Sequence, residues 1–238
     1  MVKTLSILTA MSAAFLCNTA FTAPVGNLKV AGEIKPPTCT VNGATQSDII
    51  FDYGRISPSL IPTSSVYRYP ASLVTNTVVI ECDANTYLTF VATDTYQNTE
   101  LNVSENTGNT WFHLVDKLNA DKALGATFFV WDNVSVDGST AYISRANDVA
   151  ITGDTNYRNA LYSGTTNGWT SEQQTGVNKA ELKLVAGKVF ETSFRQGQDT
   201  TTNQTFILSK NQLTQRGIDI ANGVDFIGEA VLTFNFGV

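Results

Sequence analysis

The sequence predicts an all-β protein folded as a sandwich of short strands. Segments that alternate apolar and polar residues recur along the whole chain, which is the pattern of a strand with one buried face. Few helical patterns occur, and Gly, Asn, Asp and Thr separate the alternating segments. The final segment, 227–238, alternates over its whole length. Many short strands joined by such turns favour a sandwich over an α/β fold.

The first 23 residues have the layout of a secretory signal peptide. Lys3 supplies the positive charge, and an apolar run from Leu5 to Leu16 is followed by small residues. The run is too short for a membrane span, and no second apolar block follows it. We therefore expect residues 1–23 to be a signal peptide and residues 24–238 to be a single exported domain with no transmembrane segment.

The predicted mature chain is acidic. The whole chain has 15 Lys and Arg and 21 Asp and Glu. Lys3 is the one charged residue before position 24, so the mature charge is 14 minus 21, or −7. An acidic protein lacks the electrostatic footprint for nucleic acid or anionic lipid. Nucleic acid is therefore not an expected partner.

Two cysteines, Cys39 and Cys82, remain once the signal peptide is removed. Two cysteines in an exported chain predict one disulfide, because the compartment beyond the inner membrane is oxidising. Closing a loop of about 43 residues is worth roughly 4 kcal/mol in the chain-entropy model. We expect this disulfide to be structural.

The segment from Leu28 to Ile34 alternates in the same way and predicts an extended strand near the mature N-terminus. Pro36 and Pro37 follow it and interrupt the ladder, because proline has no N–H to donate. Asp137 and Gly138 form a hairpin-turn signal. The other alternating or strand-like segments are 48–54, 76–82, 87–93, 110–115, 126–131, 140–144, 180–185, 188–194 and 205–209. Segments 76–82 and 87–93 are expected to be two adjacent strands.

Residues 147–179 are expected to form a long surface excursion, because their apolar density falls and glycines accumulate. This stretch also contains aromatic and amide residues that could stack on a sugar ring and bond its hydroxyls, as functional loops do. They are Asp154, Asn156, Tyr157, Tyr162, Asn167 and Trp169. The alternative is an ordinary solvated loop.

The sequence does not predict an enzyme. His113 is the one histidine, and no G-x-S-x-G elbow accompanies it. A structural or surface role is therefore the favoured interpretation of His113. Asp132 and Asp137 lie near each other without calcium-loop spacing, and no phosphate-binding glycine loop occurs. No metal and no cofactor are expected.

Three features together resemble the subunits of chaperone-usher fimbriae, the pilins. These are the opening segment V-x-G-x-I followed by Cys39, the second cysteine at the end of a strand, and the alternating C-terminal segment. The resemblance implies an incomplete immunoglobulin-like β-sandwich whose missing strand is supplied first by a periplasmic chaperone and later by the next subunit. Strand addition of this kind gains affinity from main-chain hydrogen bonds and register from alternate side chains.

Carried over to this chain, the resemblance assigns roles to three groups of residues. Cys39 and Cys82 match the family disulfide. The donated segment is expected within 25–34, with Val25, Leu28 and Val30 as donor residues. The C-terminal strand that borders the groove and contacts the chaperone would contain Gly228, Ala230, Leu232, Phe234 and Phe236. The implied partners are a periplasmic chaperone, an outer-membrane usher and neighbouring subunits, and the implied location is the periplasm or a fimbria on the cell surface, with a contribution to adhesion.

The chain also departs from the pilin pattern. Pilins commonly end with a penultimate tyrosine, whereas Phe236 here is third from the end, and the mature chain is longer than a simple pilin. The segments 51–60, 78–94 and 120–125 look more like the GltF-like family of exported proteins, which is related to fimbrial subunits and poorly defined in function. That resemblance keeps an alternative open: a self-complete periplasmic binding or regulatory module in which residues 28–34 pair within the same molecule.

Overall fold

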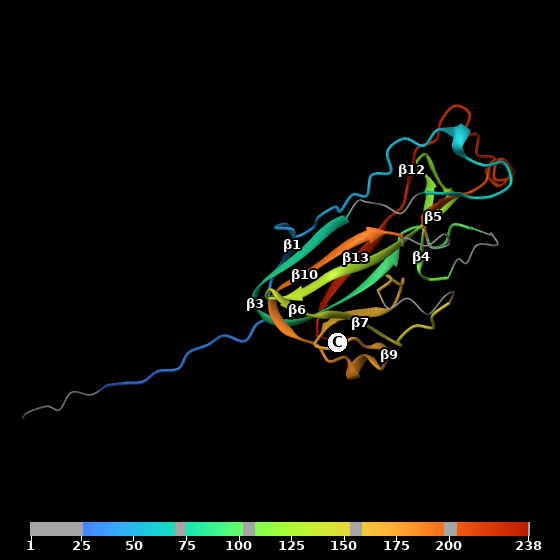
Figure 1. Ribbon diagram of the computed structural model, residues 1–238. Helices are drawn as coiled ribbons and strands as arrows, with labels where there is room; N and C mark the ends of the chain where they lie inside the picture. Colours follow the sequence, from blue (N-terminus) through green and yellow to red (C-terminus); the bar gives the residue numbers. More distant parts are fainter. Residues whose placement is uncertain (1–25, 70–74, 102–107, 153–158, 198–203, 238) are drawn as a thin grey trace, which may run out of the picture. The chain divides into compact units, whose positions relative to one another are not determined.

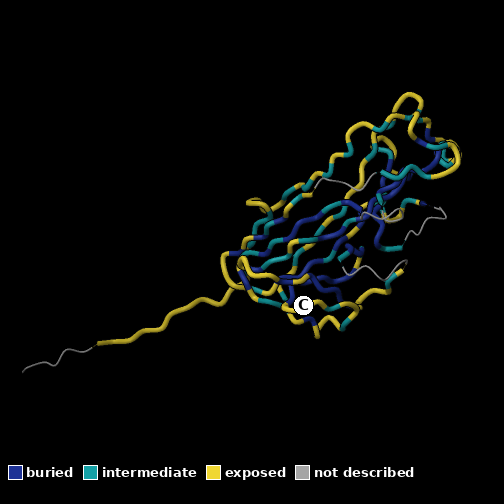
Figure 2. The backbone as a smooth tube through the Cα atoms, in the orientation of Figure 1, coloured by how far each residue is buried: buried dark blue, intermediate teal, exposed yellow. Residues whose placement is uncertain are grey.

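The computed structural model describes residues 26–69, 75–101, 108–152, 159–197 and 204–237. The described chain is nearly all β, as the sequence predicts (Figure 1). It divides into a compact unit that begins at Pro36 and an N-terminal unit that ends at Lys35. Residues 26–35 contain no regular secondary structure, and every one of them is exposed (Figure 2). The strand expected over Leu28–Ile34 is therefore not formed, because an isolated extended segment has no ladder to stabilise it.

The compact unit is built around two long strands. Each pairs with one set of strands along its first half and with another set along its second half. β3 (Thr75–Asp94) pairs through its first half with β1 (Cys39–Val41) and β10 (Ala186–Gln196). Through its second half it pairs with β13 (Ala230–Phe236) and β8 (Thr166–Thr170). Segments 76–82 and 87–93 are thus one continuous strand instead of two adjacent ones, because each half pairs with different strands.

The second long strand, β5 (Asn119–Val136), connects the layer that contains β10 to a third group of strands. Its C-terminal part pairs with β10 and β6 (Ser139–Thr140). Its N-terminal part pairs with β4 (Trp111–Asp116) and β11 (Phe206–Ile207). The remaining elements are β2 (Tyr67–Arg68), β7 (Tyr142–Ala146), β9 (Thr175–Val177), β12 (Phe226–Ile227), the short 3₁₀ turns Pro58–Leu60 and Lys179–Glu181, and α1 (Lys210–Gln215). Segment 48–54 is irregular, and 180–185 begins in a 3₁₀ turn and is not a regular strand.

The sandwich core lies between the layer of β10 and the layer of β8. Phe90 on β3, Trp169 on β8 and Phe190 on β10 are at most 1 % exposed, and they form a chain of ring contacts. Ring centroids lie 5.4 Å apart for Phe90 and Trp169 and 5.5 Å apart for Trp169 and Phe190. Because these rings come from both layers, the two layers face each other across one apolar interior. A second core, around Trp111, Phe128 and Phe206, fills the third group of strands.

Part of the expected surface excursion, 147–179, is a buried central strand. All five residues of β8 are buried, and β8 pairs with both β3 and β7. Most of its polar side chains are hydrogen-bonded internally: the Ser144 and Thr170 hydroxyls lie 2.6 Å apart, and Asn167 donates from Nδ2 to the Thr165 carbonyl, although its Oδ1 has no partner. At Gly168 a Cβ atom would lie 2.6 Å from Leu184 Cδ2, so glycine permits the close packing. Low apolar density was therefore a misleading signal, because hydrogen-bonded Thr and Asn fill the space.

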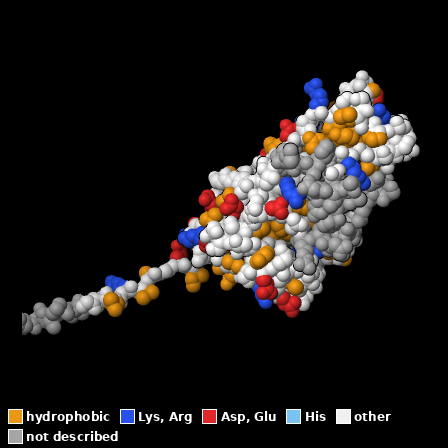
Figure 3. All heavy atoms as spheres, viewed as in Figure 1, with side chains coloured by type: hydrophobic (Ala, Val, Ile, Leu, Met, Phe, Trp, Pro, Cys, Tyr) orange, Lys and Arg blue, Asp and Glu red, His pale blue; other side chains and the backbone are white. Residues whose placement is uncertain are grey.

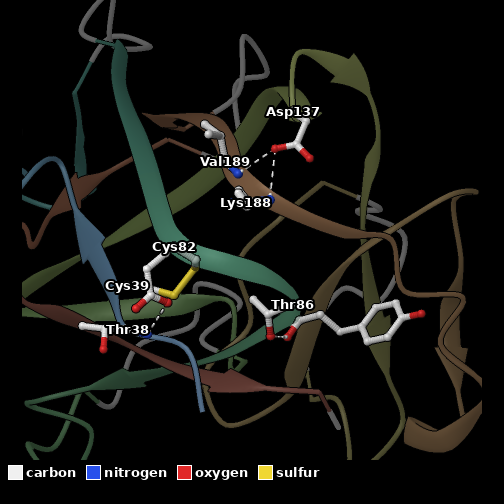
Figure 4. The surroundings of a disulfide bond; sticks show 9 residues. Thr38, Cys39, Cys82, Thr86, Asp137, Lys188 and Val189 are labelled. Carbon is white, nitrogen blue, oxygen red and sulfur yellow. Dashed lines mark hydrogen bonds between the residues drawn. A yellow bond between two sulfur atoms is a disulfide. The ribbon is translucent and has the colours of Figure 1, made fainter. Parts of the chain in front are cut away.

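The predicted disulfide joins β1 to β3 (Figure 4). Cys39 and Cys82 are direct partners in the antiparallel register, with their Cα atoms 4.1 Å apart. Figure 4 also shows Asp137, at the predicted hairpin turn, accepting hydrogen bonds from the backbone N–H groups of Lys188 (3.0 Å) and Val189 (2.8 Å). The disulfide holds the first strand, and the Asp137 carboxylate holds the hairpin to β10.

Candidate functional site

The C-terminal strand β13 is the strongest candidate for a functional surface. It pairs antiparallel with β3 from Ala230 opposite Asp94 to Phe236 opposite Leu88. Within the described ranges, β13 has no strand partner on its other side. The N–H and C=O groups that point to that side therefore form a free β-edge. We call this free side of β13 the β13 edge.

One face of β13 is apolar and only half-buried. Ala230, Leu232 and Phe234 pack against the sandwich core without being closed off from solvent. Phe90 under β13 contacts the Phe234 ring at 5.9 Å between centroids, whereas Phe236 remains 48 % exposed. The opposite face presents Val231, Thr233 and Asn235 to solvent. A strand at the end of a fully covered layer would bury this apolar face, so the core is incompletely covered here.

The β13 edge also lacks the features that usually protect an edge strand. Natural edges carry lysine, proline, bulges or inward-pointing charges that prevent pairing with another chain. From Ala230 to Phe236 the sequence AVLTFNF contains no charge and no proline. Its pairing with β3 continues over seven residues without a register shift. This edge is therefore suited to accept another extended segment.

Residues from the beginning of the compact unit are half-buried on the same core. Val41 on β1, followed by Ile49 and Phe51 in the irregular segment, pack against the sandwich core as β13 does. Phe51 contacts Phe129 at 5.3 Å between ring centroids. Asn76 at the start of β3 donates a hydrogen bond to the Ile50 carbonyl, which fixes the irregular segment beside the start of β3. The apolar core is thus incompletely covered at both the first and the last segments of the unit.

Gly228 fits its position for a steric reason. A Cβ atom there would lie 2.6 Å from Leu114 Cδ2 and 2.8 Å from the carbonyl oxygen of His113. The chain can approach β4 this closely only without a side chain, just before it enters β13. Among the residues assigned to the C-terminal strand by resemblance, Gly228 therefore positions the strand, whereas Ala230, Leu232 and Phe234 form its apolar face.

His113 belongs to a local network with Asp94. Its Nδ1 lies 2.5 Å from Asp94 Oδ2, and the Asp94 carboxylate also accepts hydrogen bonds from the backbone N–H groups of His113 and Tyr96. The Asp94 side chain is 2 % exposed, and that of His113 is 17 % exposed. This carboxylate ties the end of β3 to β4, at the register position opposite Ala230. The sequence did not indicate a role for Asp94, because its partner His113 lies 19 residues further along the chain.

Three of the aromatic and amide residues proposed for sugar binding are buried and therefore do not belong to a surface cluster. Tyr162, Asn167 and Trp169 are at most 1 % exposed and lie in the two cores or in β8. Asp154, Asn156 and Tyr157 lie outside the described residues. The proposed donor residue Val25 lies outside them as well, whereas Leu28 and Val30 are each 102 % exposed. In the described part of the chain, no group of three or more His, Cys, Asp or Glu side chains is arranged to hold a metal ion.

Tyr53 holds the irregular segment against the third group of strands through buried hydroxyls. Its hydroxyl lies 2.8 Å from Thr127 Oγ1 and 2.9 Å from Thr205 Oγ1, and those two oxygens are 2.8 Å apart. Tyr69 donates a hydrogen bond to the Tyr53 carbonyl. Burial raises the pKa of Tyr53 from 10.0 to about 12, although the bonds to the threonines oppose the shift.

The raised pKa of Tyr53 predicts a loss of stability at alkaline pH. Between pH 10 and 12 the unfolded chain releases a phenolic proton that the folded chain retains. The free energy of unfolding therefore falls across this window, by on the order of 2 kcal/mol, and is unaffected below it. Urea unfolding of wild type and Tyr53→Phe across pH 9 to about 12 measures this fall in the free energy of unfolding. The variant should show a shallower decline, and Tyr87→Phe, at a half-exposed tyrosine, should keep the wild-type slope. Equal slopes for Tyr53→Phe and wild type would contradict the assignment.

A scan against models of known protein families found no match, and a search of curated proteins found no relative.

In the described ranges, no helix combines the length and apolar character needed to span a membrane. On the face in Figure 3, acidic and basic side chains are interspersed among uncharged atoms, without a large patch of one sign. The site must therefore be interpreted from its geometry.

Proposed function

We propose that this protein is a non-enzymatic, fimbrial-type structural subunit that is exported to the periplasm and assembled by donor-strand exchange. The observation that carries the proposal is the β13 edge: seven uncharged residues paired on one side only, over an incompletely covered core. In this proposal a periplasmic chaperone covers the edge first, an outer-membrane usher receives the subunit, and a neighbouring subunit's strand then replaces the chaperone. Adhesion through the resulting fimbria is part of the same proposal.

The acceptor side of the proposal follows from the chemistry of the edge. An added strand would satisfy the outward N–H and C=O groups of β13 and place alternate side chains over Leu232 and Phe234. Such burial is favourable by about 25 cal/mol for each Å² of apolar surface removed from water. An uncovered edge of this composition is also prone to aggregation, which is the physical reason for a chaperone.

The donor side is the segment 25–34, of which the structure describes residues 26–34. Leu28, Val30 and Ile34 lie on one parity and are 102 %, 102 % and 105 % exposed. Their neighbours Lys29, Glu33 and Lys35 are charged. An added strand with this alternation would direct its apolar residues to a core and its charges to water. The segment therefore has the pattern of a strand and lacks a ladder of its own.

The alternative is a self-complete periplasmic module of the GltF-like kind. It requires residues 28–34 to pair within their own molecule, whereas the fimbrial-type subunit requires them to pair with a neighbouring one. The two functions differ in a simple property, since a self-complete module stays monomeric at every concentration, and a donor-strand subunit forms multimers or requires a covering partner.

Two aspartate substitutions on opposite parities of the donor segment test the proposal. In the mature full-length chain, Val30→Asp should reduce the multimer population by about tenfold or more, because it would place an unpaired carboxylate over the acceptor core. Ala31→Asp introduces the same charge one residue away, on the solvent-facing parity, and should assemble like wild type. Sedimentation velocity across a concentration series measures the multimers.

A synthetic peptide of residues 26–35 provides the matching competition experiment. It should inhibit assembly of the wild-type chain, and the same peptide with Val30→Asp should not. Equal effects of the Val30 and Ala31 substitutions would show that strand parity is irrelevant and would reject the donor assignment. A wild-type mature chain that stays monomeric at all concentrations and ignores the peptide would favour the self-complete module.

A further inference from the structure

A cavity lined by polar and apolar residues opens where the chain leaves the hairpin of β5 and β6 and enters β7. The N–H of Ala141 donates a hydrogen bond to the Val134 carbonyl, which joins the two arms. Beyond it, Trp131 on β5 pairs with Phe194, whereas Tyr142 on β7 pairs with Thr170. The arms therefore diverge, and the space between them is a cavity of about 380 Å³. It lies on β5 and β7 and includes no residue of β13.

An amide side chain is fixed on each wall of this cavity. Asn159 donates from Nδ2 to the Trp131 carbonyl at 3.1 Å, and Gln173 donates from Nε2 to the Ile143 carbonyl at 3.0 Å. Both residues line the cavity. No hydrogen bond within the described residues uses Asn159 Oδ1 or Gln173 Oε1; Asn159 is half-buried and Gln173 is exposed. The cavity thus has an oriented hydrogen-bond acceptor on each wall, held in place before any ligand arrives.

The rest of the lining favours a neutral ligand with many hydroxyl groups. Tyr142 is 41 % exposed and supplies an aromatic surface at the rim. Asn133 and Thr140 add further polar groups. Asp132 is the one charged side chain among the described lining residues, and Arg195 already bonds its Oδ2 at 2.8 Å. Because no cation occurs among the described lining residues and the protein is acidic, the cavity does not favour an anion.

We propose that this cavity binds the end of a neutral saccharide. Hydroxyl groups donate to Asn159 Oδ1 and Gln173 Oε1 from opposite sides, and the sugar ring lies against Tyr142. The volume is at the small end of ligand sites and accommodates one or two sugar rings. The site is open and half of its described lining residues are polar, so its affinity belongs in the millimolar range. This inference does not depend on strand exchange, because the β13 edge contributes nothing to the cavity.

Nitrogen-15 NMR of the full mature chain tests the site with methyl glycosides of glucose, galactose and mannose and with N-acetylglucosamine. At least one sugar should produce saturable shifts of the side-chain NH₂ signals of Asn159 and Gln173. Gln173→Met keeps the length of the side chain and removes its amide, so it should weaken the binding by about tenfold. Gln46→Met, at an exposed position outside the cavity, should leave the binding unchanged.

The NMR readout remains informative if Gln173→Met lowers stability, because the wild-type side-chain signals report binding directly. The absence of saturable shifts at both amides with all four sugars would overturn the proposal. Binding that survives Gln173→Met unchanged would overturn it as well. Failure of assembly in the donor-segment variants, with sugar shifts intact, would leave this site standing and would concern the β13 edge alone.

Discussion

Gly125→Ala is expected to destabilise the compact unit by about 3 kcal/mol or more, because the added methyl group meets backbone. A Cβ atom at Gly125 would lie 1.9 Å from the carbonyl oxygen of Phe206 and 2.9 Å from its carbonyl carbon. Gly125 pairs with Ile207 on β11, and Leu208 donates to the Leu124 carbonyl beside it. The clash can be relieved only by moving β11 away from β5, which breaks these bonds and opens the second core.

Gly187→Ala is the matched control for this prediction. Its Cβ atom would lie 2.2 Å from Val136 Cγ1 and 3.0 Å from Asp137 Oδ2, which are side-chain atoms and not backbone atoms, so relief of the clash does not require a strand to move. Chemical unfolding of the two variants should therefore show a smaller loss for Gly187→Ala than for Gly125→Ala. A Gly125→Ala protein as stable as the Gly187→Ala protein would mean that β11 is not held against β5 as described.

Removal of the disulfide by Cys39→Ala with Cys82→Ala is expected to cost about 4 kcal/mol of unfolding free energy. The bond closes a loop with a sequence separation of 43, and the chain-entropy model assigns roughly that value to such a loop. β1 has only three residues paired with β3, so the ladder alone holds it weakly. Guanidinium unfolding of the oxidised wild type and the double variant measures the difference.

Reductant provides the control for the disulfide prediction. It should destabilise the wild type to about the level of the double variant and should leave the double variant unchanged. A loss below about 1 kcal/mol would indicate that β1 is held mainly by packing of Val41 on the sandwich core. In the proposed assembly the bond also fixes the chain at Cys39, five residues after the end of the donor segment at Ile34.

The sequence alone predicted the elements in which one face is apolar and the other polar. Segments 110–115, 126–131 and 188–194 lie in β4, β5 and β10, and 227–238 contains β13. The pairing of Cys39 with Cys82 was also predictable, because no other cysteine remains in the expected mature chain. These features depend on local periodicity or on composition, and both can be counted along a chain.

The tertiary structure decided which segments are neighbours and which polar residues are buried. β8 is buried although it has no apolar period, because Thr and Asn side chains find hydrogen-bond partners that the sequence does not reveal. The role of Asp94 is evident only in the structure, where β3 places it beside His113. β3 is one strand because its two halves pair with different strands. Alternation in 28–34 and in β13 was equally clear in the sequence, yet one segment forms no strand and the other pairs on one side. Periodicity shows which face of a strand is apolar, whereas the partner that buries this face is determined by contacts between residues distant in the sequence.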